Sequence, residues 1–220
     1  MKTLVFTSIA LLSLSANTFA GICGVEATRI ESNYSEYNGR SVPMALNTIS
    51  SADRVLQISL AIREATTKAP VPEGYGNVVL EQANQLEREI QYKLDENLAL
   101  RRKLVDTNFE MLGCLNRSNN TNCHDSAMEL INYDTNKLTE ANSIHHSGMD
   151  LKNDFAALGE KLNKLSRSGA SAQMSDFQMT IEKAQNLFSL RNSYLNQVDA
   201  DAKVRSNLSQ SLNNCLNSSN

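Results

Sequence analysis

The fold class of this chain is decided by residues 151–165, which read LKNDFAALGEKLNKL. Leucine or phenylalanine recurs in this stretch at steps of four, three, four and three residues, and most positions between them carry Lys, Asn, Asp or Glu. This spacing places the apolar side chains on one face of an α-helix. The stretch therefore predicts an amphipathic helix, whose single apolar face must pack against other helices.

The same period extends outward along most of the chain. It predicts long helices over residues 77–113, 125–167 and 175–216, and a shorter helix over residues 43–69 that Ser41 would cap. At 1.5 Å per residue, each long helix would measure roughly 60 Å. No segment shows a competing alternation of apolar and polar residues, which would predict a β-strand. We therefore predict an all-α fold.

The predicted connections are short and either polar or rich in Gly and Pro, as in residues 70–76 (PVPEGYG) and 116–122 (NRSNNTN). Short connections make successive helices antiparallel. The predicted architecture is an elongated, coiled-coil-like antiparallel bundle over residues 43–220, with one shorter and three long helices. Residues 21–42 have weak apolar periodicity and predict an irregular N-terminal arm.

Residues 1–20 contain the three parts of a secretory signal peptide. Lys2 supplies the positive start, residues 4–14 form a short apolar core, and Ala20 ends a small-x-small motif. The apolar core is about half the length of a transmembrane helix, which needs roughly 20 apolar residues. We therefore predict cleavage before Gly21 and export to the periplasm or the outside of the cell, with no membrane span in the mature chain.

Four cysteines follow the predicted cleavage site: Cys23, Cys114, Cys123 and Cys215. An even number of cysteines in an exported chain predicts disulfides. In the predicted bundle all four lie at one pole, where three pairings are possible. We favour Cys114 with Cys123, which would close the polar turn, and Cys23 with Cys215, which would join the arm to the last helix. A zinc site is the alternative, but the sequence lacks the Cys-x-x-Cys spacing typical of such sites.

The composition argues against several classes of function. The net charge is −3, Trp is absent and aromatic residues make up only 5% of the chain, so neither a basic surface nor a base-stacking platform is expected. The motifs Gly-x-Ser-x-Gly, Ser-x-x-Lys and His-Glu-x-x-His are also absent. We therefore predict that the protein is not an enzyme, holds no cofactor and binds no nucleic acid.

The best candidates for a metal site are His145, His146 and Asp150 in the predicted third helix. His146 and Asp150 are four residues apart and therefore share a helix face. The adjacent histidines point about 100° apart, which makes joint ligation difficult. A solvated polar face is the alternative interpretation.

The remaining function class is an interaction module that presents its long helices to a protein partner or to a second copy of itself. Its overall form resembles that of periplasmic helical adaptors and of small pilus-associated subunits of type IV secretion systems, although no motif carries the resemblance. It implies an adaptor or accessory subunit of a bacterial envelope, secretion or pilus apparatus; a periplasmic ligand- or metal-binding bundle is the alternative. The candidate docking residues are apolar side chains outside the main stripes: Leu80, Leu100, Met111, Leu187 and Leu190.

Overall fold

The structure is a computed structural model that describes residues 23–218, apart from the side chains of residues 41–55, 90, 93–94, 187–188 and 190–199. The predicted signal peptide, residues 1–20, lies outside the described residues. The described chain contains helices and no strand, which confirms the all-α prediction. Its elements are the long helices α1 (Gly24–Thr66), α2 (Tyr75–Arg117), α3 (His124–Arg167) and α4 (Gln178–Ser218), with short 3-10 helices η1 (Thr121–Cys123) and η2 (Met174–Asp176).

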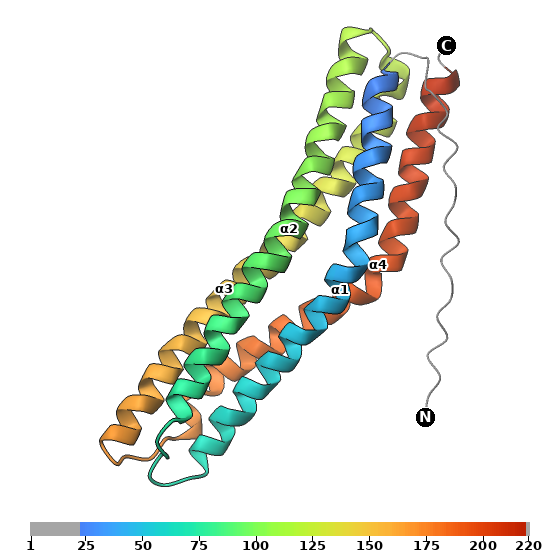
Figure 1. The fold of residues 1–220 in the computed structure, drawn as a ribbon. Helices are drawn as coiled ribbons and strands as arrows, with labels where there is room; N and C mark the ends of the chain where they lie inside the picture. Colours follow the sequence, from blue (N-terminus) through green and yellow to red (C-terminus); the bar gives the residue numbers. More distant parts are fainter. Residues whose placement is uncertain (1–22, 219–220) are drawn as a thin grey trace.

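The four long helices lie lengthwise beside one another and form an elongated molecule (Figure 1). The start of α1, the α2–α3 connection and the end of α4 meet at one end, which we call the disulfide end. The α1–α2 and α3–α4 connections meet at the opposite end, which we call the far end. Each end has its own hydrophobic core.

The core of the far end contains large side chains that are fully buried, among them Phe155, Phe177, Ile58 and Leu162. Phe155 and Leu162 belong to the 151–165 stretch, so the apolar residues that predicted the helix are also residues that pack in the core. Burying one such side chain contributes about 1.5–3 kcal/mol. The core of the disulfide end is smaller and consists of Cys23, Ala27, Ile30, Met111, Leu115, Cys123, Ala127, Leu130, Leu212 and Leu216.

The predictions of an irregular arm and of a shorter first helix are wrong, because residues 24–42 form the first part of α1, a helix of 43 residues. Ala27 and Ile30 of this part pack in the core of the disulfide end, but the inward side chains of residues 31–40 are polar or tyrosine, and their contacts are mainly hydrogen bonds. Asn33 Nδ2 donates to Thr107 Oγ1 at 2.7 Å, and the Tyr34 hydroxyl donates to a backbone carbonyl of α4 at 3.2 Å. The spacing of apolar residues therefore does not predict that this segment is helical.

The predicted helix start at Ser41 is also wrong, since Ser41 and Pro43 lie inside α1. Proline inside a helix removes one backbone hydrogen bond. The helix makes contacts on both sides of Pro43: Arg40 pairs with Glu96 of α2 at 2.7 Å, and Ile58 is fully buried in the far-end core.

The four cysteines do form two disulfides at one end, but the favoured pairing is wrong. Cys23 bonds Cys114, with Cα atoms 5.8 Å apart, and Cys123 bonds Cys215, with Cα atoms 5.6 Å apart. The cause is that α2 continues past Cys114 to Arg117, so the helix holds that side chain beside the start of α1 and away from Cys123. Each disulfide therefore closes one helix pair, α1 with α2 and α3 with α4.

Two glycines allow α2 and α3 to approach closely near the far end. A Cβ atom added to Gly76 would lie 2.5 Å from the carbonyl oxygen of Gly159, and one added to Gly159 would lie 2.9 Å from the carbonyl oxygen of Gly76. Both distances are shorter than Cβ contacts in real proteins. The backbones therefore touch at a point where neither helix can carry a side chain.

We expect Gly76→Ala to lower the free energy of unfolding by about 1–3 kcal/mol, because the added methyl group must push two helix backbones apart. The matched control is Gly39→Ala in α1, where an added Cβ meets no atom within 4 Å. This control should raise stability by up to about 1 kcal/mol, since alanine favours a helix more than glycine does. Urea denaturation followed by circular dichroism measures both values, and equal effects would contradict the close approach.

Candidate functional site

A buried ion pair lies between the two hydrophobic cores. The carboxylate of Asp134 on α3 accepts hydrogen bonds from Nε of Arg205 on α4 at 3.0 and 3.1 Å. Nη2 of Arg205 lies 3.0 Å from Oδ2 of Asp134, within ion-pair distance but not aligned as a hydrogen bond. The two side chains are only 3% and 4% exposed. This is the most deeply buried pair of charges among the described residues.

All four long helices contribute to this pair. Asn108 of α2 donates from Nδ2 to Oδ2 of Asp134 at 2.7 Å, and the guanidinium of Arg205 lies 4.1 Å from the ring centre of Tyr34 of α1. Such cation–π contact adds an attraction that is stronger where water is excluded. We call Tyr34, Asn108, Asp134 and Arg205 the polar core. It joins all four long helices at one level of the molecule.

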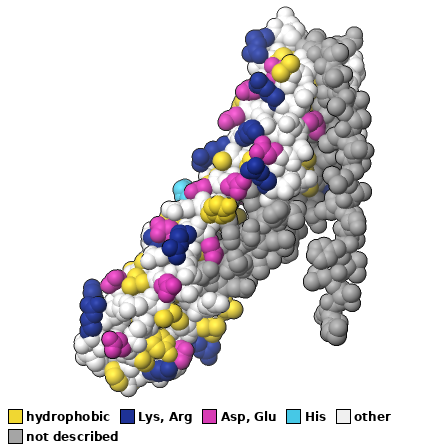
Figure 2. All heavy atoms as spheres, in the orientation of Figure 1, with side chains coloured by type: hydrophobic (Ala, Val, Ile, Leu, Met, Phe, Trp, Pro, Cys, Tyr) yellow, Lys and Arg dark blue, Asp and Glu magenta, His cyan; other side chains and the backbone are white. Residues whose placement is uncertain are grey.

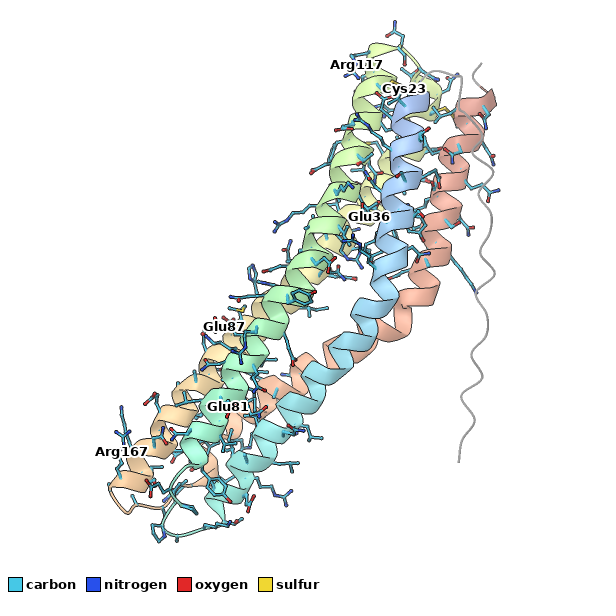
Figure 3. All side chains as sticks on the ribbon, in the orientation of Figure 1. Cys23, Glu36, Glu81, Glu87, Arg117 and Arg167 are labelled. Carbon is cyan, nitrogen blue, oxygen red and sulfur yellow. A yellow bond between two sulfur atoms is a disulfide. The ribbon has the colours of Figure 1, made fainter. Side chains whose placement is uncertain are left out.

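A cavity of about 30 Å³ opens beside the polar core. Its walls come from α1, α2, α3 and α4, and its polar lining includes Tyr34, Tyr37, Arg101, Tyr133, Lys137 and Asp201. Lys137 Nζ pairs with Asp201 at 3.1 Å, and the Tyr133 hydroxyl donates to the Asp201 backbone carbonyl at 2.9 Å. Glu36, labelled in Figure 3, is near this level of α1 and pairs with Lys103 of α2 at 2.8 Å.

Two polar atoms of Arg205 remain without a hydrogen bond. Neither Nη1 nor Nη2 donates to an acceptor among the described residues, although both atoms are buried. A guanidinium carries five N–H donors, and an unsatisfied buried donor costs about 1–3 kcal/mol or more when it is charged. Arg205 lines the cavity. The unsatisfied donors and the free space therefore occur together.

The sequence analysis did not identify Asp134 or Arg205. A signal was present: Asp134 follows buried Leu130 by four residues, and Arg205 precedes buried Leu212 by seven, so each charge lies on the apolar stripe of its helix. A charged residue on an inward stripe is rare unless it is paired. Because the two partners are 71 residues apart, the spacing within each helix does not reveal the pairing.

Burial raises the pKa of both Tyr34 and Tyr133. For Tyr34 the nearby Arg205 opposes this effect, whereas for Tyr133 the negative Asp201 adds to it. A phenol whose folded-state pKa exceeds its unfolded value of about 10 stabilises the fold below that pH. This stability is lost as the pH rises above about 10, because the unfolded chain releases its phenol protons more readily.

We therefore expect alkaline titration to show a late tyrosine step that coincides with loss of helix. The chain has six tyrosines, and absorbance at 295 nm follows their ionisation while circular dichroism follows the helices. Tyr133→Phe should shrink the late step, and Tyr92→Phe, which removes a tyrosine that is 77% exposed, should leave it intact. A single ionisation step with unchanged helix signal would contradict the expectation.

The structure does not bring His145, His146 and Asp150 together as three metal ligands. His145 Nε2 lies 2.9 Å from Asp95 of α2, and its ring meets the ring of His146 edge-on at 5.8 Å. His146 and Asp150 are exposed. Within the described part of the chain, one set of three potential ligands lies close enough for a metal, namely Cys23, Glu26 and Cys114. Its two sulfur atoms bond each other, so they offer no thiolate.

Several large apolar side chains are exposed on the elements that meet at the far end. Figure 2 shows hydrophobic side chains gathered on the lower part of the face in view, while charged side chains of both signs occur along the whole of it. Leu60 is 53% exposed and Met179 is 72% exposed. We call the following exposed residues of α1, α2, η2 and α4 the far-end surface: Leu56, Leu60, Val78, Met174 and Met179.

The predicted docking residues do not coincide with this surface. Leu100 and Met111 are buried, and Leu80 is half-buried against Gly159, so these three belong to the interior. The side chains of Leu187 and Leu190 lie outside the described residues. By contrast, Leu56 and Leu60 of α1 are exposed.

Comparisons with known proteins identified no relative of this chain. No protein-family model, curated protein or solved structure matches this chain. Among the described residues, no helix combines the length and the apolar character needed to cross a membrane. Function must therefore be argued from the residues themselves.

Proposed function

We propose that this protein is an exported, non-enzymatic module that binds another protein through the far-end surface. The observation that carries the proposal is the exposure of large apolar side chains on α1, α2, η2 and α4 in the half of the molecule that contains the far end. Leu56 and Leu60 are four residues apart on α1 and so share one face of the helix. Exposed apolar side chains that cluster on one part of a surface are typical of interaction sites.

The charged groups around this surface support the proposal. Glu64 pairs with Lys68 at 2.9 Å, and Lys161 pairs with Asp176 at 3.0 Å. Because these charges are neutralised within the chain, a partner gains most by covering the apolar side chains. An apolar centre within a polar rim is the usual composition of a protein interface.

Export is part of the same proposal. Two disulfides persist in an oxidising compartment such as the periplasm or the cell exterior, and residues 1–20 have the pattern of a signal peptide. We therefore propose an adaptor or accessory subunit of a bacterial envelope, secretion or pilus apparatus. The finer architecture, an antiparallel and coiled-coil-like bundle, suits an elongated spacer that displays its docking surface at one end.

The proposal is tested by substituting far-end residues and measuring partner capture. The amount measured is that of one defined partner recovered from the envelope of the producing cells. We expect Leu60→Glu and Met179→Glu each to reduce this amount by at least about tenfold. The reason is that removing or charging a central apolar contact commonly costs more than about 1.4 kcal/mol of binding free energy. The matched control is Val204→Glu in the middle part of α4, away from the far end, where the valine is 46% exposed.

The controls make the outcome specific. All three variants should retain the helix signal and unfolding midpoint of the parent protein, because each changes an exposed residue. Equal capture by the parent, Leu60→Glu and Met179→Glu proteins would remove the far-end surface from the proposal. Sedimentation of the purified protein distinguishes a foreign partner from a second copy of this chain. Self-association would make the apparent molecular mass rise with protein concentration, and Leu60→Glu would abolish that rise.

A further inference from the structure

We propose that Met174 and Met179 are oxidation sites, and that their conversion to methionine sulfoxide prevents docking at the far-end surface. The inference rests on the proposed function, because it concerns the regulation of the same surface. Three observations carry it: the exposure of the two thioethers, the engagement of every cysteine in a disulfide, and the fixed backbone between the two methionines.

The methionines of the chain differ widely in exposure. Met179 is 72% exposed and Met174 is 41% exposed, whereas Met111 is fully buried in the core of the disulfide end. Met128 and Met149 are half-buried. Oxidation of a sulfur atom requires that the oxidant can reach it. Among the methionines whose side chains the structure describes, the two most accessible thioethers therefore both belong to the far-end surface.

The reaction needs one two-electron oxidant of the peroxide class. Hydrogen peroxide transfers one oxygen atom to the thioether sulfur, so an S–O bond forms, the O–O bond breaks and water leaves. The sulfur loses two electrons, which the peroxide gains. No thiol competes for the oxidant, because all four cysteines are held in disulfides, and the chain has no Trp. Exposed thioethers are therefore the groups that the oxidant attacks first.

The product changes the chemistry of the docking surface. Oxidation turns a flexible apolar side chain into a polar one, whose sulfoxide oxygen binds water. A partner that covers the far-end surface would have to remove this water, and burial of a polar group without a hydrogen bond is costly. Oxidation should therefore weaken docking. Methionine sulfoxide reductases reverse the reaction, so the loss should be reversible.

The backbone between the two methionines is held by other groups. Phe177 is fully buried in the far-end core, and its amide donates to the carbonyl of Met174 at 3.0 Å. Asp176 pairs with Lys161 of α3 at 3.0 Å, and the Lys161 ammonium lies 5.6 Å from the centre of the Phe177 ring. Oxidation of the two exposed side chains should therefore alter the surface without unfolding the helices.

The first test identifies the oxidised residues. The purified, folded protein is treated with hydrogen peroxide for increasing times, and peptide mass spectrometry measures the oxygen added at each methionine. We expect Met179 to be oxidised first and Met174 next, with an unchanged helix signal and unfolding midpoint. Met111 should react only after the protein is unfolded in urea. Oxidation of Met111 as fast as Met179 in the folded protein, or loss of helix as Met179 reacts, would overturn the proposal.

The second test measures partner capture after the peroxide has been removed. The oxidised parent protein should recover at least about tenfold less of the defined partner than the untreated parent, and methionine sulfoxide reductases should restore the capture. The matched control carries Met174→Leu and Met179→Leu together, which keeps apolar side chains of similar volume without sulfur. Its capture is compared before and after peroxide, and the two amounts should be equal.

The outcomes separate this proposal from the proposed function. If the untreated and the oxidised parent capture equal amounts of the partner, the oxidation switch is overturned and the docking surface stands. If peroxide lowers capture by the double variant as much as by the parent, another residue is responsible and the switch is again overturned. If the untreated parent captures no partner, the proposed function fails and the switch fails with it.

Discussion

Replacing Cys23 and Cys114 together by alanine should lower the free energy of unfolding by about 4 kcal/mol, and replacing Cys123 and Cys215 together should do the same. The two disulfides span 91 and 92 residues, and in the chain-entropy model a loop of this length contributes about 4–5 kcal/mol. The loops do not overlap in sequence. The two losses should therefore add, and the protein without both bonds should be largely unfolded at 37 °C.

Urea denaturation followed by circular dichroism measures these losses, with the slope of the transition reporting whether the unfolded state has also changed. A loss below about 1 kcal/mol for either pair would show that the disulfides close loops that are already held by packing. The pairing itself has a separate check. In the single variant Cys23→Ala, a thiol-labelling reagent should modify Cys114 alone; labelling of Cys215 would contradict the structure.

The second large effect concerns the buried ion pair. Asp134→Leu alone should lower the free energy of unfolding by about 3–5 kcal/mol, because it leaves the Arg205 guanidinium buried without its counter-charge. Arg205→Met alone should cost a similar amount. The double variant should recover most of that loss, since apolar residues of similar volume commonly replace a buried pair at little cost.

The double-mutant cycle yields the coupling energy of the two residues, which we expect to exceed about 2 kcal/mol. The matched comparison is the exposed pair of Arg29 and Glu110, whose atoms approach to 2.8 Å but whose side chains are 59% and 53% exposed. Solvent screens that pair, so its coupling should stay below about 1 kcal/mol. Equal coupling in the two cycles would mean that Asp134 and Arg205 are accessible to water in solution.

The sequence predicted those parts of the fold whose packing is apolar. Residues 151–165 form an uninterrupted helix in which Leu151, Phe155 and Leu162 are buried, as their spacing indicated. The polar segment 116–122 contains the α2–α3 connection, and all four cysteines meet at one end. In these places a single physical effect, burial of apolar surface on one helix face, determines the local structure.

The first helix shows why other parts could not be predicted. In α1 the pairs Leu56 with Leu60 and Ile58 with Ile62 both have helical spacing, and the two pairs point about 200° apart. The pattern alone cannot tell which pair faces inward, and the structure buries the isoleucines. The choice depends on the surfaces of α2, α3 and α4, which the sequence of α1 does not contain.

The candidate site could be predicted only in part, for a related reason. The apolar stripes of their helices mark Asp134 and Arg205 as unusual, but their pairing is a contact across 71 residues that neither stripe contains. The partner of each cysteine likewise depends on the direction in which a helix carries its last turns, as for Cys114 in α2. Such pairings depend on tertiary contacts, and the spacing of residues within one helix does not contain that information.

The central claim, that the protein acts by binding a partner through the far-end surface, is tested most directly by site-specific photocrosslinking in the producing cells. A photoreactive amino acid would replace Leu60 in one protein and Val204 in another, both of them exposed positions on long helices. We predict one adduct of defined mass from position 60 and none from position 204. No adduct from position 60, or the same adducts from both positions, would contradict the account.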